Sequence, residues 1–99
     1  MSQASLILLV KFKSALSLEE VSAVIDSRAH EFRELKGLQQ KYYLHEPATD
    51  EYAGLYLWES NEDFLVYRDS ELRASIASAY QTEGEPRIEV FNILKPLRD

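Results

Sequence analysis

The chain has 99 residues, the length of one small domain, and its 17 Asp and Glu against 11 Lys and Arg give a net charge of -6. This charge repels phosphate backbones and anionic lipid, so neither nucleic acid nor a membrane is an expected partner. The absence of cysteine excludes disulfide scaffolds, Cys-rich zinc sites and thiol catalysis.

The first predicted element is a strand from Ser5 to Lys13, because this stretch is short, apolar and free of Gly and Pro. Alternation places Leu6 and Val10 on one face and Leu9 and Lys11 on the other, so both faces are apolar at the strand's start. The apolar run is too short for a signal peptide or a membrane span, which makes a cytoplasmic protein the expectation.

A helix should follow from Leu18. Ser17 and Glu20 have the spacing of a capping box, in which each side chain satisfies a backbone N–H of the other. Apolar residues then recur at spacings of three, four and seven, as on an amphipathic helix. Gly37 is expected to end this helix as a left-handed cap.

The stretch from Gly37 to Ser60 is predicted to be a β-hairpin, since it is rich in aromatics on both sides of a polar turn. Pro47 should stop the first strand near Glu46, leaving a connection of roughly four residues. Gly54, inside the second strand, indicates either a bulge, which is the first expectation, or a close approach to the backbone.

The rest of the chain should form short helices and a last strand. Ser60 and Ser70 are candidate N-caps, so two helices with a break near Asp69 are expected between residues 61 and 80. A turn at 84–86 then precedes a strand from Arg87 to Leu94, whose two faces are again apolar.

This element order predicts one α+β domain over residues 1–99. It is the ferredoxin-like βαββαβ arrangement, a four-stranded antiparallel sheet with helices on one face. The second face of the sheet would be a large exposed apolar patch in a monomer. Two copies packed sheet to sheet would cover it, so a homodimer is expected.

The hairpin also resembles a known family. Its second strand, A-G-L-Y-L-W at residues 53–58, and the acidic turn before it are similar to the antibiotic-biosynthesis-monooxygenase-like branch of the dimeric α+β barrel superfamily. The likeness is greatest to the small monooxygenases of the YdhR type, whose corresponding strand carries G-G-I-Y-L and then an aromatic. Position 53 is Ala where those relatives have Gly.

The resemblance implies a homodimeric barrel with a ligand pocket in each subunit, between the sheet and its helices. Better understood relatives oxidise electron-rich aromatic compounds with molecular oxygen and without metal or flavin. A phenol or quinol that is deprotonated in a desolvated pocket can itself pass an electron to oxygen. The resemblance therefore predicts a cofactor-independent monooxygenase, with no cofactor and a small aromatic molecule as its partner.

Six residues are candidates for such a site. Lys11 is predicted to stabilise an anionic substrate, His45 to act as a base, and Tyr56 to donate a hydrogen bond. The predicted substrate-binding residues are aromatic: Tyr43, Trp58 and Tyr67. Each candidate also has a structural explanation, because Lys11 and His45 fit exposed positions and the aromatics fit the core or an interface. The hairpin register decides which of them share a face.

A haem-degrading branch of the superfamily shares the motif Trp58-Glu59-Ser60 with a Phe six residues after the tryptophan, here Phe64. In that branch a histidine on the following helix ligates the iron, and its place is taken here by Ala77. An axial ligand is thus missing, so haem is not expected.

Two other functions are also compatible with the sequence. One is a non-catalytic barrel that binds a small ligand or serves as a dimeric interaction module, and the other is a lyase or isomerase of the same superfamily. The sequence has no Ser-His-Asp set, paired-carboxylate spacing or phosphate loop, and its two histidines, His30 and His45, do not form a ligand motif. No metal site is therefore predicted, and fold does not imply function.

Overall fold

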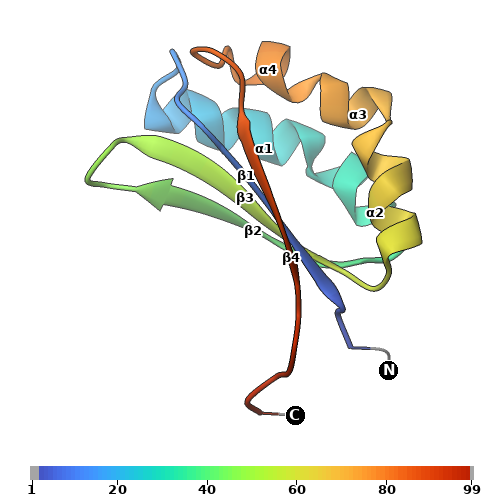
Figure 1. The fold of residues 1–99 in the computed structure, drawn as a ribbon. Coiled ribbons are helices and arrows are strands. Elements are labelled where there is room, and N and C mark those ends of the chain that lie inside the picture. The colour runs from blue at the N-terminus through green and yellow to red at the C-terminus, as the bar shows by residue number, and fades with distance from the viewer. Residues whose placement is uncertain (1–2, 99) are drawn as a thin grey trace.

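One antiparallel sheet carries the helices on a single face in the computed structural model, which describes residues 3–98 (Figure 1). The strand order is β2-β3-β1-β4. The strands are β1 (Leu6–Phe12), β2 (Leu38–Glu46), β3 (Glu51–Trp58) and β4 (Arg87–Asn92). The helices are α1 (Leu18–Arg33), α2 (Asn61–Arg68), α3 (Glu71–Ala74) and α4 (Ile76–Ala79). This arrangement confirms the predicted ferredoxin-like fold.

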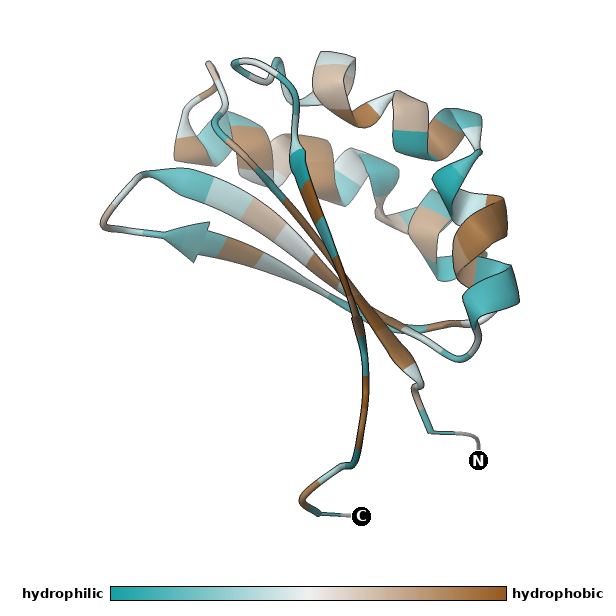
Figure 2. Cartoon of the chain, in the orientation of Figure 1, coloured by the Kyte–Doolittle hydropathy of each residue, from teal (hydrophilic) through white to brown (hydrophobic). Residues whose placement is uncertain are grey.

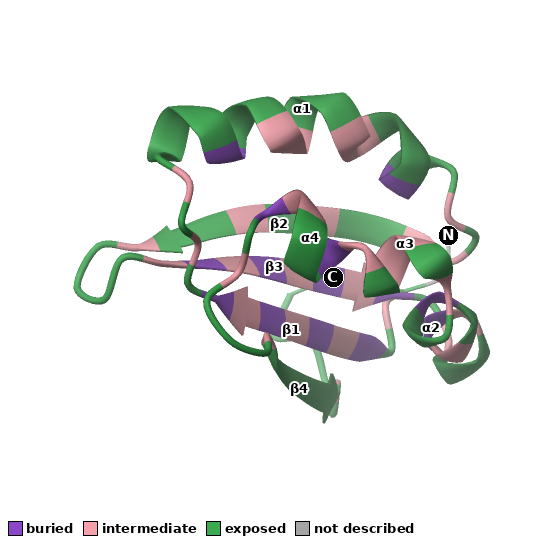
Figure 3. Ribbon diagram, turned by 90° about the horizontal axis from the view of Figure 1, so that it is seen from above, coloured by how far each residue is buried: buried purple, intermediate pink, exposed green. Residues whose placement is uncertain are grey.

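The core forms where the central strands β1 and β3 face the helices. Every second residue of these strands is buried, and Figure 3 shows the result as alternating stripes. The pairing Leu8 with Tyr56 and Leu6 with Trp58 keeps the buried residues of both strands on one face. The buried residues contributed by the helices are Val21, Phe32, Phe64, Tyr67 and Ile76.

The start of α1 agrees with the predicted capping box. The Ser17 hydroxyl accepts from the Glu20 N–H at 3.2 Å, and the Ser17 N–H donates to the Glu20 carboxylate at 3.0 Å. The predicted end was wrong, because α1 stops at Arg33 and not at Gly37. Gly37 is left-handed, with φ of 80°, but its carbonyl accepts from the Glu59 N–H at 2.8 Å. Its conformation thus leads the chain into β2 and does not cap the helix.

The hairpin agrees with its predicted bounds, since β2 ends at Glu46 and residues 47–50 connect it to β3. The irregularity in this pair lies between Leu38 and Gln40, and the pairing at Gly54 is regular. The first expectation for Gly54, a bulge, was therefore wrong, and the alternative of a close approach holds. A Cβ atom at this position would lie 2.9 Å from a ring carbon of Tyr56 and 3.2 Å from Cε of Lys41.

The segment from 61 to 80 is more divided than expected. Ser60 and Ser70 cap α2 and α3, and the break comes at Asp69 as predicted. A further break at Ser75 separates α3 from α4. The Ser75 hydroxyl accepts from the Arg28 guanidinium at 3.0 Å, so α1 is tied to this second break. The last strand ends at Asn92, two residues before the predicted end.

The second face of the sheet has an apolar centre with charged residues at one end, and it is not covered by the helices. This open face consists of the alternate residues that point away from the core: Ile7, Leu9 and Lys11 of β1, Tyr42, Leu44 and Glu46 of β2, Glu51, Ala53, Leu55 and Leu57 of β3, and Arg87, Glu89 and Phe91 of β4. Hydrophobic residues run along the central strands of the sheet in Figure 2. None of the helices in residues 3–98 has the length and hydrophobicity needed to cross a membrane.

The capping box gives a test of the fold. Ser17→Ala should lower the free energy of unfolding by about 1 kcal/mol, because the Glu20 N–H loses its acceptor. The Ser17 backbone N–H, which Ser17→Ala keeps, lowers the pKa of Glu20, so the part of the stabilisation that comes from the Glu20 carboxylate is present above the usual carboxyl range and is lost as the pH falls. Denaturant unfolding at neutral and acid pH measures both effects.

Ser27→Ala is the matched control for the cap. Ser27 lies on the exposed side of α1 and its hydroxyl only donates to the Val24 carbonyl. Its replacement should change stability by about 0.5 kcal/mol or less. Equal losses in the two variants would show that the capping box contributes nothing specific.

Candidate functional site

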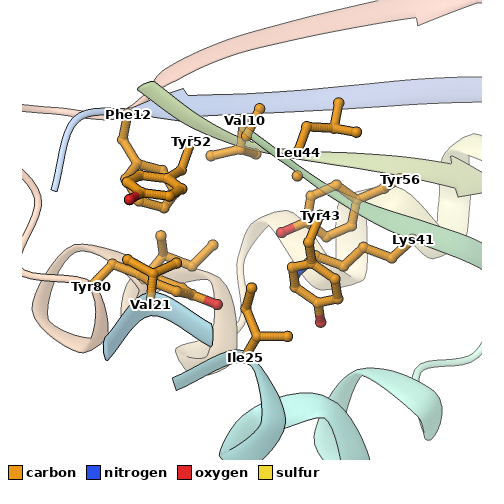
Figure 4. A pocket seen from close by; sticks show the side chains of 13 residues that line it. Val10, Phe12, Val21, Ile25, Lys41, Tyr43, Leu44, Tyr52, Tyr56 and Tyr80 are labelled. Atoms are coloured by element: carbon orange, nitrogen blue, oxygen red, sulfur yellow. The ribbon is translucent and has the colours of Figure 1, made fainter. Parts of the chain in front are cut away.

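A narrow pocket lies between the sheet and the helices. It has a free volume of about 30 Å³ and is bounded by β1, β2, β3, α1, α4 and the residue that follows α4. Figure 4 shows aromatic rings at both ends. The lining residues are Val10, Phe12, Val21, Ile25, Lys41, Tyr43, Leu44, Tyr52, Ala53, Gly54, Tyr56, Ile76 and Tyr80. Within the described chain, Lys41 is the charged residue of this lining.

Lys41 is held by aromatic rings and not by an anion. Its Nζ atom lies 3.4 Å from the centre of the Phe32 ring, 4.4 Å from that of Tyr43 and 4.5 Å from that of Tyr56. Among residues 3–98, no Asp or Glu lies within ion-pair distance of this amine. Among the described residues the ammonium form is therefore stabilised by ring faces, which compensate for the loss of water less well than a carboxylate would.

The position of Lys41 follows from strand geometry. In β2, Lys41, Tyr43 and His45 point to the helix face because they pair with the core-facing residues of β3. Gly54 is the partner of Tyr43 and lies beside Lys41, and the missing Cβ leaves room for the lysine methylenes. The pairing of Lys41 with Tyr56 then brings the amine over the tyrosine ring.

Burial changes the acidity of this amine. Desolvation, with a smaller contribution from the nearby Arg28 guanidinium, lowers the pKa of Lys41 from its ordinary 10.5 to about 7. The amine is therefore divided between its neutral and charged forms near neutral pH. A lysine in this state can accept a proton or bind an anion, which an exposed lysine at the same pH does less well.

Tyr56 and Tyr67 supply hydroxyl groups in the same region. Their oxygens are 3.0 Å apart, and both side chains are buried. Burial raises the pKa of Tyr67 to about 12 and that of Tyr56 well above its ordinary value. Both phenols stay protonated at neutral pH, so they can donate hydrogen bonds but do not act as bases.

A wider groove adjoins the pocket on the outer side of β2. It has a free volume of about 300 Å³ and shares Lys41 and Tyr43 with the pocket. Phe32 and Arg33 of α1 line its other side. Ligand sites usually have 300 to 1,000 Å³, so the groove and not the inner pocket has the size of a ligand site. Lys41 and Tyr43 form the boundary between the two spaces.

Two of the predicted catalytic residues lie outside this pocket. Lys11 points to the open face, because the preceding residue, Val10, faces the core. There it pairs with Glu46 and Glu51, and the hydrogen bond that Lys11 donates to the Glu46 carboxylate raises the pKa of Lys11. This position corrects the expectation that Lys11 would stabilise an anion in the pocket between sheet and helices.

His45 lies at the exposed tip of the hairpin. Its Nε2 atom is 2.8 Å from an Asp50 carboxylate oxygen, and its ring centre lies 4.9 Å from that of Tyr52. The side chain is on the helix face of β2 but beyond the pocket, so the structure does not bring it together with Tyr56. A direct role as base in this pocket is therefore not supported by its position.

The predicted aromatic residues divide into pocket and core. Tyr43 and Tyr56 line the pocket. Trp58 is fully buried beside Tyr56 and Phe64, and Tyr67 contacts Tyr56 from behind the pocket wall. Neither Trp58 nor Tyr67 lines the pocket itself.

The sequence prediction missed Lys41 as well as three aromatic residues of the other end: Phe12, Tyr52 and Tyr80. The sequence did indicate that Lys41 shares a face with Tyr43, because side chains alternate along a strand. Only the hairpin register, which sets Lys41 beside Gly54, shows that this face lines the pocket. No group of three or more His, Cys, Asp or Glu in residues 3–98 has the arrangement needed to hold a metal ion.

Comparison with protein-family models assigns the chain. Residues 7–98 match the model described as "Putative mono-oxygenase ydhR". The chain belongs to this family. The match includes all of the helices and all of the strands except Leu6, the first residue of β1. The pocket of the YdhR-type chain therefore lies wholly within the matched segment. Among curated proteins there is no significant match.

Solved structures show the same fold. SnoaB, a cofactor-independent oxygenase from Streptomyces nogalater, has a TM-score of 0.76 at 16% identity, with 97% of this chain and 99% of that chain covered. A monooxygenase from the gene ActVA-Orf6 of Streptomyces coelicolor, in complex with nanaomycin D, has a TM-score of 0.72 at 17% identity, with 97% and 93% covered.

A third similar structure is an antibiotic biosynthesis monooxygenase, described as putative, from Deinococcus radiodurans. Its TM-score is 0.73 at 9% identity, with 95% of this chain and 97% of that chain covered. At such identities these likenesses establish the fold of the YdhR-type chain and not its substrate.

The desolvated amine of Lys41 gives the second prediction. Between about pH 7 and pH 9 the unfolded chain keeps a proton on Lys41 that the folded chain loses, so the free energy of unfolding should rise with pH. The expected slope is about 1 kcal/mol per pH unit. Denaturant unfolding of the wild type and of Lys41→Met measures it, and the variant should lack this rise.

Lys13→Met is the control, because Lys13 is exposed and should leave the pH dependence unchanged. If Lys41→Met and the wild type show the same slope, the amine is not desolvated as the geometry indicates.

Proposed function

We propose that this member of the YdhR family is a cofactor-independent monooxygenase that acts on a small electron-rich aromatic compound of the phenol or quinol type. The substrate binds where the groove and the pocket meet, between the sheet and the helices. The observation that supports this proposal is a half-buried lysine, without an acidic partner in residues 3–98, whose amine lies against an aromatic lining.

The lining suits a flat aromatic ligand. At one end the ring centre of Phe12 lies 6.3 Å from that of Tyr52 and 5.1 Å from that of Tyr80. Tyr43 and Tyr56 lie at the other end (Figure 4). Aromatic pairs at such separations add stabilisation beyond the area they bury, so a planar ring bound between the two ends gains contacts on both faces.

Similar proteins support the choice of chemistry. SnoaB is a cofactor-independent oxygenase, and the Streptomyces coelicolor monooxygenase binds nanaomycin D in its crystal structure. Applied to the YdhR-type chain, these observations suggest that the substrate itself reduces oxygen. For a substrate of the anthrone type, a CH₂ group becomes a carbonyl, one oxygen atom enters the product and the other leaves as water. Four electrons pass from the substrate to one O₂.

The chain's own residues have simple tasks in this reaction. The aromatic lining binds the ring and excludes water, which keeps a substrate anion reactive toward oxygen. The Tyr56 hydroxyl, oriented by Tyr67, is placed to donate a hydrogen bond to a substrate oxygen. Because the inner pocket holds only about 30 Å³, Tyr43 and Lys41 at its boundary have to move when a ring enters from the groove.

Oxygen uptake by the purified chain tests this function. An electrode should record consumption above the buffer rate with some members of a panel of hydroquinones, naphthols and anthrones. Tyr56→Phe should lower the rate about tenfold or more, because a donor aimed into the pocket is lost. Tyr42→Phe, which changes a tyrosine of the open face, should leave the rate unchanged.

A panel that binds to the protein but consumes no oxygen would contradict the proposal. It would favour the alternative of a non-catalytic module that binds a small aromatic molecule.

We also infer that the protein is a homodimer. In one subunit the open face leaves Tyr42, Leu44 and Phe91 with about half of their surfaces exposed. This face can pack against the same face of a second copy, because a two-fold axis places identical patches opposite each other. Lys11 and Glu51 are partners of opposite charge at one end of the face, which fits a polar rim around an apolar centre.

Sedimentation at micromolar concentration should therefore give twice the mass of one chain. Leu55→Glu, at the centre of the open face, should shift the protein toward the monomer, because a buried charge without a partner is costly. Val66→Glu changes an exposed residue of α2 on the helix side and should leave the dimer intact. A wild type that sediments as a single chain would exclude this assembly.

A further inference from the structure

No carboxylate of the described chain lies within ion-pair distance of the Lys41 amine. The residues facing its amine come from three elements: Phe32 from α1, Tyr43 from β2 itself and Tyr56 from β3. The charged group whose field reaches the amine is the Arg28 guanidinium of α1, which is tied to the Ser75 hydroxyl at 3.0 Å. Arg33 lines the outer groove. An anion that enters therefore meets positive groups without a competing acid.

The other titratable groups near the amine are phenols that remain neutral. Burial raises the pKa of Tyr43, Tyr56 and Tyr67, and raises that of Tyr80 to about 12. None of them can take a proton from a substrate at neutral pH. His45, the remaining candidate base of the hairpin, lies outside the pocket beside Asp50. Lys41 is thus the group of this lining that can change its protonation state.

The geometry points to Lys41 as the residue that takes the proton of the substrate hydroxyl and then binds the resulting phenolate, an inference that rests on the proposed function. The O–H bond of a phenol or enol breaks, its proton goes to the lone pair of the neutral Nζ atom, and the electron pair stays on the oxygen. The products are a phenolate and an ammonium group, so charge and atoms balance without an oxidant.

The phenolate also supplies the negatively charged partner that Lys41 does not have among residues 3–98. In a pocket of low polarity the ammonium and phenolate stabilise each other more strongly than they would in water. This mutual stabilisation makes the transfer favourable once water is excluded. The substrate class follows: the compound needs a free phenolic or enolic hydroxyl, and its methyl ether should neither transfer a proton nor react.

Binding of 3-nitrophenol tests the transfer without any oxygen chemistry. This probe is mostly neutral in solution at about pH 7.5, and its phenolate is recognised by a visible absorption band. The wild type should bind it as the phenolate while releasing no proton into weakly buffered solution, since the amine has taken that proton. Binding of the neutral probe, or release of one proton per bound probe, would overturn the proposal.

Two variants at the same position separate accepting a proton from holding an anion. In Lys41→Arg the permanently charged guanidinium should still bind the phenolate, but with release of about one proton per probe because arginine cannot accept one. In Lys41→Met the phenolate band should be absent and the affinity about tenfold or more weaker. Lys13→Met should behave as the wild type. A phenolate band that persists in Lys41→Met would contradict the inference.

The same variants separate this inference from the proposed function. If the wild type oxidises a panel compound, Lys41→Met should lose that turnover, whereas the rate of Lys41→Arg should rise with pH as the free substrate hydroxyl ionises, because this variant can only bind the anion already formed. Turnover in Lys41→Arg that does not follow the ionisation of the free substrate would mean that another group accepts the proton. If the panel gives no oxygen uptake but the nitrophenol results hold, the monooxygenase function fails while the proton transfer to Lys41 stands.

Discussion

The pairing of β2 with β3 is the constraint on which the site depends. It places Lys41 beside Gly54 and opposite Tyr56, so that a lysine stem fits where any other residue at position 54 would add a Cβ atom in close contact. The amine then lies against three aromatic rings and loses most of its hydration. The acidity of Lys41, the aromatic lining and the boundary with the groove all follow from this register.

The sheet separates two kinds of chemistry by alternation alone. One face, under the helices, holds the pocket, and the other holds a patch of apolar residues with charged groups at one end. Lys11 and Lys41 illustrate the separation. Both are strand lysines among apolar neighbours, but Lys11 has carboxylate partners that favour its charged form, whereas Lys41 has rings that only partly replace water.

The architecture could be predicted from the sequence because its signals are local. The capping box at Ser17, the proline that stops β2 and the serines before α2 and α3 each act through neighbours a few residues away, and each was found in its predicted place. The apolar content of both strand faces likewise indicated the open face. The end of α1 was misplaced because the role of Gly37 depends on a distant partner, Glu59.

The site was predicted less well, since it depends on contacts between segments far apart in the chain. Tyr43 and Tyr56 could be proposed from their residue type, and both line the pocket. Lys41 could not be separated from an ordinary strand lysine without knowing which residue of β3 lies beside it. His45 has a residue type suited to catalysis, but the hairpin carries it beyond the pocket. The choice between pocket and core for Trp58 likewise required the packing of α2.

The place of β2 at the edge of the sheet has a consequence for how such chains can diversify. Its residues alternate between the pocket side, with Lys41 and Tyr43, and the open face, with Tyr42 and Leu44. Single substitutions here can alter ligand preference or subunit contacts separately, because the central strands are untouched. Gain or loss of one residue within β2 would instead exchange the two sets at once. Insertions and deletions within this strand should therefore be rarer among related chains than substitutions of its side chains.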